Sequence, residues 1–311
     1  MKKQATREAY GKALLELGKQ HQDIVVLDAD LSKSTKTAEF ARVFPERFIN
    51  AGIAEQNMMG MSAGLAAAGK TVFASTFAVF AAGRAFEQIR NSIAYAALDV
   101  KICATHAGIT VGEDGGSHQS VEDIALMRII PGMRVVVPAD GPSTGQLLEQ
   151  LYHRKGPAYL RLGRLAVDQV YAEDNKLELD RGVELKIGTE ATIVACGIMV
   201  DRAIQAWELL SREGISVSVV DMHTIKPLDQ ELLIKKAKET GAILTVEEHS
   251  IIGGLGSAVC EIVSEYYPVP VLRMGIKDQF GQSGRPEELL QHYGLGVEDI
   301  VQKVRNLLEI K

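Results

Sequence analysis

A regular alternation of short apolar, β-branched runs with helical patterns sets the fold class of this chain. Strands that alternate with helices in this way form parallel sheets built from strand–helix–strand units. In the first half we expect strands at residues 24–27, 71–74, 100–104, 134–137 and 158–161. We expect helices between them at residues 7–20, 55–69, 82–95, 120–128 and 142–153.

A second series of alternating elements follows a polar, charge-mixed stretch at residues 168–188. Strands are expected at residues 191–195, 215–220, 243–246 and 271–274, and helices at 200–213, 230–240 and 257–266. The pattern therefore predicts an α/β protein of two domains, each a mostly parallel sheet flanked by helices. We expect a first domain at residues 1–170, a linker at 171–188 and a smaller domain at 189–311.

The composition excludes several classes of partner and location. The chain has 311 residues, 46% hydrophobic, and a net charge of −6 without a basic run, which argues against nucleic acid or an anionic membrane as its partner. The first residues lack the apolar core of a signal peptide, and no apolar run is long enough to span a bilayer, so we expect a cytoplasmic protein. Cys103, Cys196 and Cys260 lie apart and are expected to be reduced core residues.

Polar or aromatic side chains follow several of the expected strands. Ligands of open α/β sheets bind at the carboxyl ends of the strands, so these segments are the first candidates for a site. A polar loop at residues 28–35 follows the first strand, and Phe77 and Phe80 follow the second. The loop at residues 105–119 follows the third strand, and Arg164 comes shortly after the fifth.

Glu55 begins an apolar, small-residue stretch that would otherwise be assigned to the core. A buried carboxyl is costly unless it is paired or neutralised, and acids in apolar surroundings concentrate at active sites. The simpler interpretation is an acid at a helix start, near the positive end of the helix dipole. Its position alone leaves both interpretations open.

The loop at residues 105–119 is the most specific local signal, because it holds two histidines, two adjacent carboxylates and four glycines in fifteen residues. Glycines let the backbone fold tightly against a ligand, and histidines supply acid–base groups near neutral pH. Metal binding by His106, Asp114 and His118 is the competing hypothesis. Their spacing matches no recognised ligand pattern, so we expect no metal site in this chain.

Several ordered motifs together resemble the transketolase family, over essentially the whole chain. Those similar to its pyrimidine-binding domain are Ala54-Glu55-Gln56-Asn57-Met58, the pair Phe77 and Phe80, and the segment 112–119, whose His118 lies twelve residues after His106. Those similar to its C-terminal domain are the segments 221–229 and 247–249.

The resemblance implies an enzyme that uses thiamine diphosphate. In that family a glutamate, here Glu55, hydrogen-bonds the pyrimidine ring of the cofactor and favours the imino form that activates the thiazolium carbon. A carboxyl able to share a proton in a dry pocket suits that role. Phe77 and Phe80 would stack on or edge the pyrimidine, and Asp30 matches an acid near the thiazolium.

The resemblance also implies residues that bind a sugar phosphate. His106, Arg164, Arg7 and Ser34 match family positions that meet the substrate phosphate. Asp114 matches an acid that binds a sugar hydroxyl, and His118 a histidine at the reacting carbons. Without the resemblance, Arg7 and Ser34 would be a solvated helix charge and a turn residue.

The chain departs from the family pattern in three places. The usual Thr-His-Asp-Ser is Thr105-His106-Ala107-Gly108, and the tyrosine that commonly follows the second aromatic is Gly83, so the sugar preference stays open. No Gly-Asp-Gly motif occurs in the chain. In the family this motif helps to hold Mg²⁺ and the diphosphate, so we expect these ligands on a separate N-terminal subunit, in an α2β2 assembly.

The predicted function is transfer of a two-carbon ketol unit between sugar phosphates, by the C-terminal subunit of a split transketolase. A 2-oxo acid dehydrogenase beta subunit shares this layout, but Gln56-Asn57-Met58 and Glu113-Asp114-Gly115 favour transketolase. A non-catalytic interaction subunit of the same fold is the alternative from another class. A nicotinamide-binding protein is disfavoured, because residues 253–257 lack the full dinucleotide spacing and are interpreted as a packing or interface turn.

Overall fold

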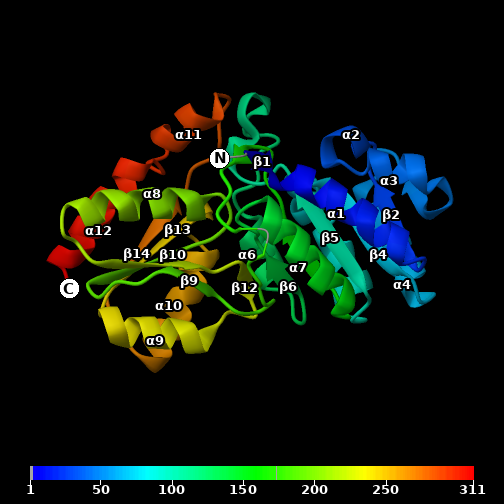
Figure 1. Cartoon of the computed structure of the whole chain (residues 1–311). Helices are drawn as coiled ribbons and strands as arrows, with labels where there is room; N and C mark the ends of the chain where they lie inside the picture. Colours follow the sequence, from blue (N-terminus) through cyan, green and yellow to red (C-terminus); the bar gives the residue numbers. More distant parts are fainter. Residues whose placement is uncertain (1–2, 173) are drawn as a thin grey trace.

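The computed structural model describes residues 3–172 and 174–311. Positions 1 and 2 of the expected first domain and position 173 of the expected linker lie outside the described residues. Figure 1 shows two α/β halves side by side, the N-terminal half in blue to green and the C-terminal half in yellow to red. The expected two-domain α/β architecture is confirmed.

The larger sheet has the strand order β12-β6-β7-β5-β4-β2-β3. Its strands are β2 (Ile24–Asp28), β3 (Phe48–Asn50), β4 (Thr71–Phe77), β5 (Val100–Thr105), β6 (Arg134–Val136), β7 (Ala158–Arg161) and β12 (Thr224–Lys226). All neighbours pair in parallel except β12, which pairs antiparallel with β6. The second half of the chain thus supplies an edge strand to the sheet of the first half.

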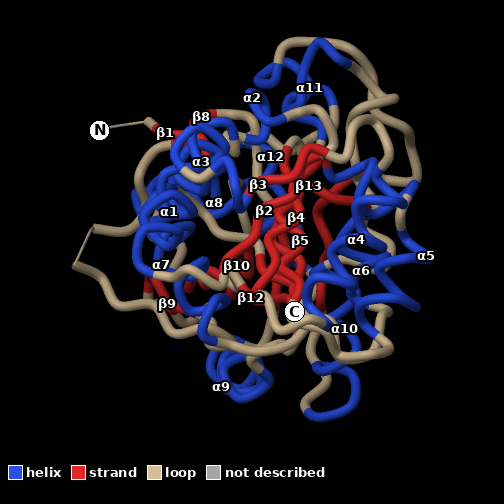
Figure 2. Tube along the Cα trace, turned by 90° about the vertical axis from the view of Figure 1, so that its right-hand side faces the viewer, coloured by secondary structure: helices blue, strands red, loops and turns tan. Residues whose placement is uncertain are grey.

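Helices cover both faces of this sheet, with α1 and α7 on one side and α4 and α6 on the other (Figure 2). The helical segments of this half are α1 (Thr6–Gln20), α2 (Ser32–Thr35), α3 (Ala38–Val43), η1 (Pro45–Arg47), α4 (Glu55–Ala67), η2 (Val79–Arg84), α5 (Phe86–Gln88), η3 (Ile89–Ala94), η4 (Ile109–Asp114), α6 (Asp123–Arg128) and α7 (Gly141–His153). Side chains of a strand alternate between the faces. In β2, Val26 accordingly packs with Tyr10 of α1, and Leu27 packs with Met58 of α4.

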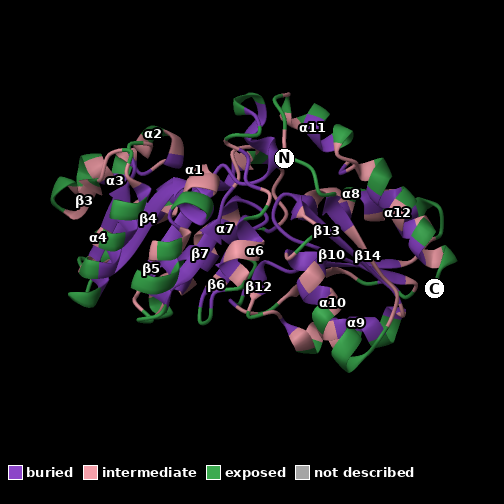
Figure 3. Cartoon of the chain, turned by 180° about the vertical axis from the view of Figure 1, so that it is seen from behind, coloured by how far each residue is buried: buried purple, intermediate pink, exposed green. Residues whose placement is uncertain are grey.

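The smaller sheet has the order β14-β13-β10-β11-β9, parallel except for the β9 edge. Its strands are β9 (Val183–Lys186), β10 (Ala191–Ala195), β11 (Val217–Asp221), β13 (Ile243–Ser250) and β14 (Val271–Ile276). Its helices are α8 (Met199–Arg212), α9 (Gln230–Thr240), α10 (Leu255–Tyr266), α11 (Pro286–His292) and α12 (Val297–Glu309). Helices α8 and α12 share one face and α9 and α10 the other, and the buried residues of both sheets form the centre of each half (Figure 3).

Three observed features differ from the expected elements. The expected helix at 82–95 is instead the short α5 between two π-helical segments, η2 and η3, whose backbone bonds span five residues, as in Ala85 N to Phe80 O at 3.2 Å. The apolar spacing that predicted a helix does not resolve the number of residues per turn. The strand β9 lies in the expected linker, and β1 (Gln4–Ala5) pairs with β8 (Ala166–Val167) in a small separate sheet.

Candidate active site at the carboxyl edge of the larger sheet

The strands β7, β5, β4 and β2 are consecutive neighbours in the larger sheet, so their carboxyl ends meet at one edge. The polar and aromatic segments that follow these strands are the ones singled out in the sequence. The topology therefore gathers at this edge the loop after β2, η2 after β4, the loop after β5 and Arg164 after β7.

Glu55 is the first residue of α4, and only 2% of its side chain is exposed. The free backbone N–H groups of a helix start favour an anion there. A second stabilising contact comes from η2, where Arg84 Nη1 donates to Glu55 Oε2 at 2.7 Å. The buried carboxylate is therefore paired, which meets the condition for keeping a charge in an apolar surrounding.

An aromatic cluster adjoins this ion pair. The rings of Phe77 and Phe80 stack nearly parallel, with centroids 5.8 Å apart, and the guanidinium carbon of Arg84 lies 4.6 Å from the centroid of Phe80. His106 stacks on Phe77 at 3.8 Å, and His118 meets Phe80 edge to face at 5.6 Å. Arg84 thus connects the buried carboxylate to the aromatic rings.

His106 is held as a neutral imidazole. Arg7 Nη1 lies 3.1 Å from its Nε2, and Thr105 Oγ1 lies 2.9 Å from its Nδ1. Because a guanidinium only donates, Nε2 accepts and Nδ1 carries the proton. Burial, and after it the charges of Arg7 and Arg164, lower the pKa of His106 to about 3. The imidazole accepts a hydrogen bond here and does not add positive charge.

Positive charge gathers beside this histidine. Arg7 also donates to the carbonyl of Ser34 at 2.9 Å, and its pKa is lowered first by burial and then by Arg164. Its Nε is buried and has no hydrogen-bond partner among the described residues. Arg164 donates to the carbonyl of Val111, and its Nη1 lies 3.6 Å from Asp114 Oδ2. Two guanidiniums with an unused donor suit an anionic ligand.

Some predicted site residues take other positions. Asp30 has a positive φ of 63° and exchanges hydrogen bonds with Asn50 at 3.1 and 3.2 Å, and none of its hydrogen bonds reaches the histidines. Ser34 contributes its backbone carbonyl to Arg7. His118 is half-buried, with Ser117 Oγ 3.0 Å from its Nδ1. Across residues 3–172 and 174–311, no group of three or more His, Cys, Asp or Glu side chains is arranged to hold a metal ion.

The loop after β5 is anchored on the second half of the chain, at the end of β13. Glu248 Oε1 accepts from Thr110 N at 2.6 Å, and a Cβ on Gly108 would lie 2.2 Å from the Glu248 carboxyl carbon. At the other end of the loop, Ser250 N donates to Val121 O at 2.7 Å. The position of the loop that carries both histidines thus depends on residues more than a hundred positions away.

A buried ion pair stabilises the same junction. Arg161 Nε donates to Asp123 Oδ2 at 2.8 Å, and Tyr159 donates to the same oxygen. Arg161 Nη2 also donates to the carbonyls of Ser120 and Glu248, so it connects the end of the loop to β13. Burial lowers the pKa of Arg161, but its neighbouring anions, Asp123 foremost, together raise it by more.

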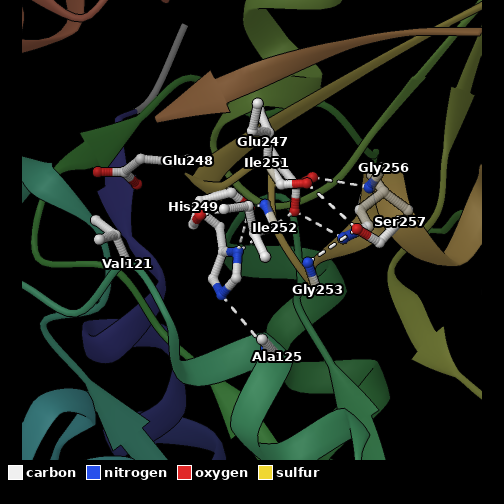
Figure 4. A network of polar contacts seen from close by, with 12 residues as sticks. Val121, Ala125, Glu247, Glu248, His249, Ile251, Ile252, Gly253, Gly256 and Ser257 are labelled. Carbon is white, nitrogen blue, oxygen red and sulfur yellow. Dashed lines mark hydrogen bonds and ion pairs between the residues drawn. The ribbon is translucent and has the colours of Figure 1, made fainter. Parts of the chain in front are cut away.

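The glycine-rich turn at residues 253–257 binds a carboxylate of the protein itself, that of Glu247. Glu247 Oε2 and Oε1 accept from the backbone N–H groups of Leu255 and Gly256, both at 2.7 Å (Figure 4). Gly254 leaves no room for a Cβ, which would lie 2.1 Å from Glu247. The start of α10 is therefore closed by a protein carboxylate, in agreement with its interpretation as a packing turn.

The sequence did not single out three residues of this region: Arg84, Arg161 and Asp123. An exposed arginine such as Arg84 is ordinarily a solvated charge, so only its contacts distinguish it. An arginine at the end of an apolar strand, as in Ala158-Tyr159-Leu160-Arg161, is a usable signal for a buried ion pair.

Within the described residues, no helix is both long enough and apolar enough to cross a membrane.

Comparisons with known families cover almost the whole chain. Residues 2–169 match the family model described as transketolase, pyrimidine binding domain. Residues 180–300 match the model described as transketolase, C-terminal domain.

Individual proteins match at full length. The chain is 53% identical to a Methanocaldococcus jannaschii protein described as a transketolase C-terminal section, over 96% of this chain and 94% of that protein. It is 43% identical to one of the subunits of an apulose-4-phosphate transketolase from Phocaeicola vulgatus, over 95% of each. Among solved structures, a split gene transketolase in the form of an inactive β4 tetramer has 57% identity and a TM-score of 0.93, over 99% of each chain.

Longer relatives match over part of their length. The chain is 38% identical to human transketolase over 98% of its own residues and 49% of that protein. It thus spans about half the length of the transketolases of this longer kind.

Proposed function

Because the chain belongs to the transketolase family and corresponds to the C-terminal subunit of a split transketolase, we propose that it takes part in transfer of a two-carbon ketol unit between sugar phosphates. The observation that carries this proposal is the pairing of a buried carboxylate, Glu55, with an aromatic cluster at the carboxyl edge of the sheet. We infer that the activity appears when this chain is joined to a second subunit.

The residues of this edge fit thiamine diphosphate, the cofactor of the family. A buried acid beside parallel aromatic rings offers a hydrogen bond in the plane of a heterocycle and a surface for its face. The contacts that Arg84 makes with Glu55 and Phe80 support this proposal, because they come from a planar group with N–H donors. Glu55 would hold the pyrimidine nitrogen, and Phe77 and Phe80 would orient the ring. The bound cofactor supplies the nucleophilic carbon that carries the ketol unit.

The cationic residues support a phosphate-bearing sugar as the substrate. Arg7, whose buried Nε lacks a partner among the described residues, and Arg164 would bind the phosphate, and neutral His106 would accept or donate through its ring nitrogens. His118, against Phe80, would lie at the reacting carbons, and Asp114 would bind a sugar hydroxyl. We retain Ser34 and Asp30 as weaker candidates near the phosphate and the thiazolium, because their present contacts are with Arg7 and Asn50.

The partner proposed is an N-terminal subunit with a Gly-Asp-Gly motif that holds Mg²⁺ and the diphosphate, in an α2β2 complex. Two findings support a divided enzyme: human transketolase is about twice the length of the matched region, and the related split transketolase occurs as an inactive β4 tetramer. In this division of labour, the present chain supplies the pyrimidine-binding and sugar-binding residues.

Reconstitution tests the proposal. The chain alone should bind thiamine diphosphate weakly and turn over no sugar phosphate, and addition of the N-terminal subunit with Mg²⁺ should restore both. Calorimetry and a ketol-transfer assay, performed on each subunit and on the mixture, measure the two properties. Tight, magnesium-dependent binding by the lone chain would show that the diphosphate ligands are not divided in this way. An inactive mixture would count against the catalytic function.

A further inference from the structure

One guanidinium contacts two of the three residues that the proposed function assigns to the cofactor's pyrimidine. Arg84 Nη1 donates to Glu55 Oε2 at 2.7 Å, and the guanidinium carbon lies 4.6 Å from the ring centroid of Phe80. A guanidinium is flat, carries N–H donors in its plane and stacks on aromatic faces. A pyrimidine that donates a ring N–H to a carboxylate and packs on phenylalanine presents the same two features.

We propose that Arg84 occupies the place of the pyrimidine in the unloaded protein and is displaced when thiamine diphosphate binds. This inference rests on the proposed function and extends it. Arg84 becomes a residue that sets cofactor affinity by competing for Glu55.

Exchange of one donor for another explains how Glu55 is tolerated before the cofactor arrives. Only 2% of the Glu55 side chain is exposed, and a buried carboxylate without a partner strongly destabilises a fold. With Arg84 in the empty site and the pyrimidine in the loaded site, the carboxylate always has a donor.

The surroundings of Arg84 allow its side chain to leave without moving the backbone. The side chain is 47% exposed, so the guanidinium already borders solvent. The Arg84 carbonyl accepts from Gln56 Nε2 at 3.2 Å, a contact that does not involve the guanidinium. We infer that a change of the Arg84 rotamer is sufficient for displacement.

Competition has a measurable consequence for affinity. When only a fraction of the sites is free of Arg84, the apparent dissociation constant of the cofactor rises by the reciprocal of that fraction. Removal of the guanidinium should therefore tighten cofactor binding while it destabilises the empty protein. A permanent counter-ion of Glu55 would behave differently, because its loss would destabilise both forms and leave the cofactor bound equally or more weakly.

The experiment uses the complex reconstituted from this chain and its N-terminal subunit, with thiamine diphosphate and MgCl₂ as the probe. Arg84→Met should lower the melting temperature of the unloaded complex and bind thiamine diphosphate about 3- to 10-fold more tightly by calorimetry. The loaded variant should melt close to the loaded wild type. Arg90→Met is the matched control, because Arg90 is an exposed arginine of the neighbouring η3 whose side chain bonds Asn91 instead of Glu55. It should change neither quantity.

Repeating the substitution in the Glu55→Gln variant distinguishes the loss of the Arg84–Glu55 contact from a general folding defect. In Glu55→Gln the amide needs no cation, so adding Arg84→Met should leave the melting temperature of the unloaded complex unchanged. Unchanged or weaker cofactor binding by Arg84→Met, or equal losses of stability in the loaded and unloaded complexes, would overturn the exchange while leaving the proposed function in place. A wild-type complex that binds no thiamine diphosphate would overturn both.

Discussion

Glu55 has two possible roles at the start of α4, and its exchange for glutamine separates them. Glu55→Gln keeps the shape and one hydrogen-bond acceptor but removes the acid. A role in activating the cofactor predicts a loss of kcat on the order of 10²-fold or more in the reconstituted complex. Folding should survive, because an amide is easier to bury than a charge and Arg84 remains partly solvated.

The measurement pairs kcat with the melting temperature of the same preparation. Glu87→Gln is a suitable control, since Glu87 is an exposed acid of α5 whose carboxylate accepts from Gln88 and Asn91. If Glu55 only stabilises the helix start, its variant should instead lose about 1 kcal/mol of stability and keep near-normal turnover. That result would remove the catalytic assignment.

The lowered pKa of His106 predicts that the free energy of unfolding falls in acid. The pKa is about 3 in the folded chain, against about 6.5 for an ordinary histidine. Between these values the unfolded chain binds a proton that the folded chain does not, so unfolding is favoured as the pH falls below about 6.5. The contribution is at most about 1.4 kcal/mol per pH unit. The free energy of unfolding of the wild type should therefore decline towards that of His106→Asn as the pH falls from 6.5.

Urea unfolding of both proteins at several pH values measures this difference directly, because the other titrating groups are common to both. NMR of the His106 ring gives an independent check. Its signals should show no titration between pH 5 and 8, and a midpoint near 6.5 would disprove the neutral, buried assignment.

At the scale of elements, β13 controls the loop after β5. The Glu248 carboxylate accepts from Thr110 N and closes the space above Gly108. Glu248→Ala leaves that N–H without its partner, and we expect roughly a 10-fold loss of kcat/KM for the sugar phosphate as the histidine loop loosens. Glu248→Gln should retain most of the activity, because an amide oxygen still accepts the bond.

Hydrogen exchange at Thr110 reports the loop itself. It should accelerate in Glu248→Ala and stay near the wild-type rate in Glu248→Gln. Glu265→Ala is the control, since Glu265 is an exposed acid of α10 away from the loop. An unchanged kcat/KM with a protected Thr110 amide in Glu248→Ala would show that the contact does not position the loop.

The elements of this fold differ in how far the sequence predicts them. Buried strands such as β2 and β7 were predicted within about one residue, because apolar β-branched runs between turns have few other interpretations. The edge strand β12 was missed because three residues carry no pattern and its partner β6 lies far away in the chain. The π-helical η2 was predicted as ordinary helix, since spacing does not fix the residues per turn.

The residues of the candidate site also divide into those that the sequence predicts and those that it does not. Glu55, Phe77, His106 and Arg164 were found because each ends or follows a strand, or begins a helix, within a motif. The structure brings their segments to one edge. Their chemical roles stay predictions. The contribution of Arg84 depends on side-chain contacts between α4 and η2, and that of Glu248 on contacts between the two halves. Sequence proximity carries no signal for such pairs.

At the scale of the whole molecule, we expect the isolated chain to self-associate. Gly64 lies on the exposed side of α4, where a Cβ would meet no atom within 4 Å. Ile53 just before α4 and Tyr95 at the end of η3, which contacts α4, are 78% and 91% exposed. Small residues permit close helix approach, and symmetric pairing is the usual result. Sedimentation at micromolar concentration should show dimers or larger species.

A bulky substitution tests whether α4 forms the contact between two copies of the chain. Gly64→Arg should shift the lone chain towards monomer with unchanged circular dichroism. Gly145→Arg on α7 is the control, because that helical glycine also has open space at its Cβ. Sedimentation of the wild type as monomer alone would contradict self-association. If Gly64→Arg and Gly145→Arg were both monomeric, the effect would not be specific to α4, and the interface would not be assigned to that helix.

The antiparallel pairing of β12 with β6 has a consequence for biosynthesis. During translation β6 leaves the ribosome well before residues 224–226 are synthesised. Until then the edge of the larger sheet at β6 has no partner strand. Such edges invite pairing with other chains, and domains otherwise tend to fold in the order of their synthesis. Here the sheet that carries the candidate site is completed only after residues 224–226 of the second half have been translated. A split of the coding sequence between the two halves would separate this strand from its partner.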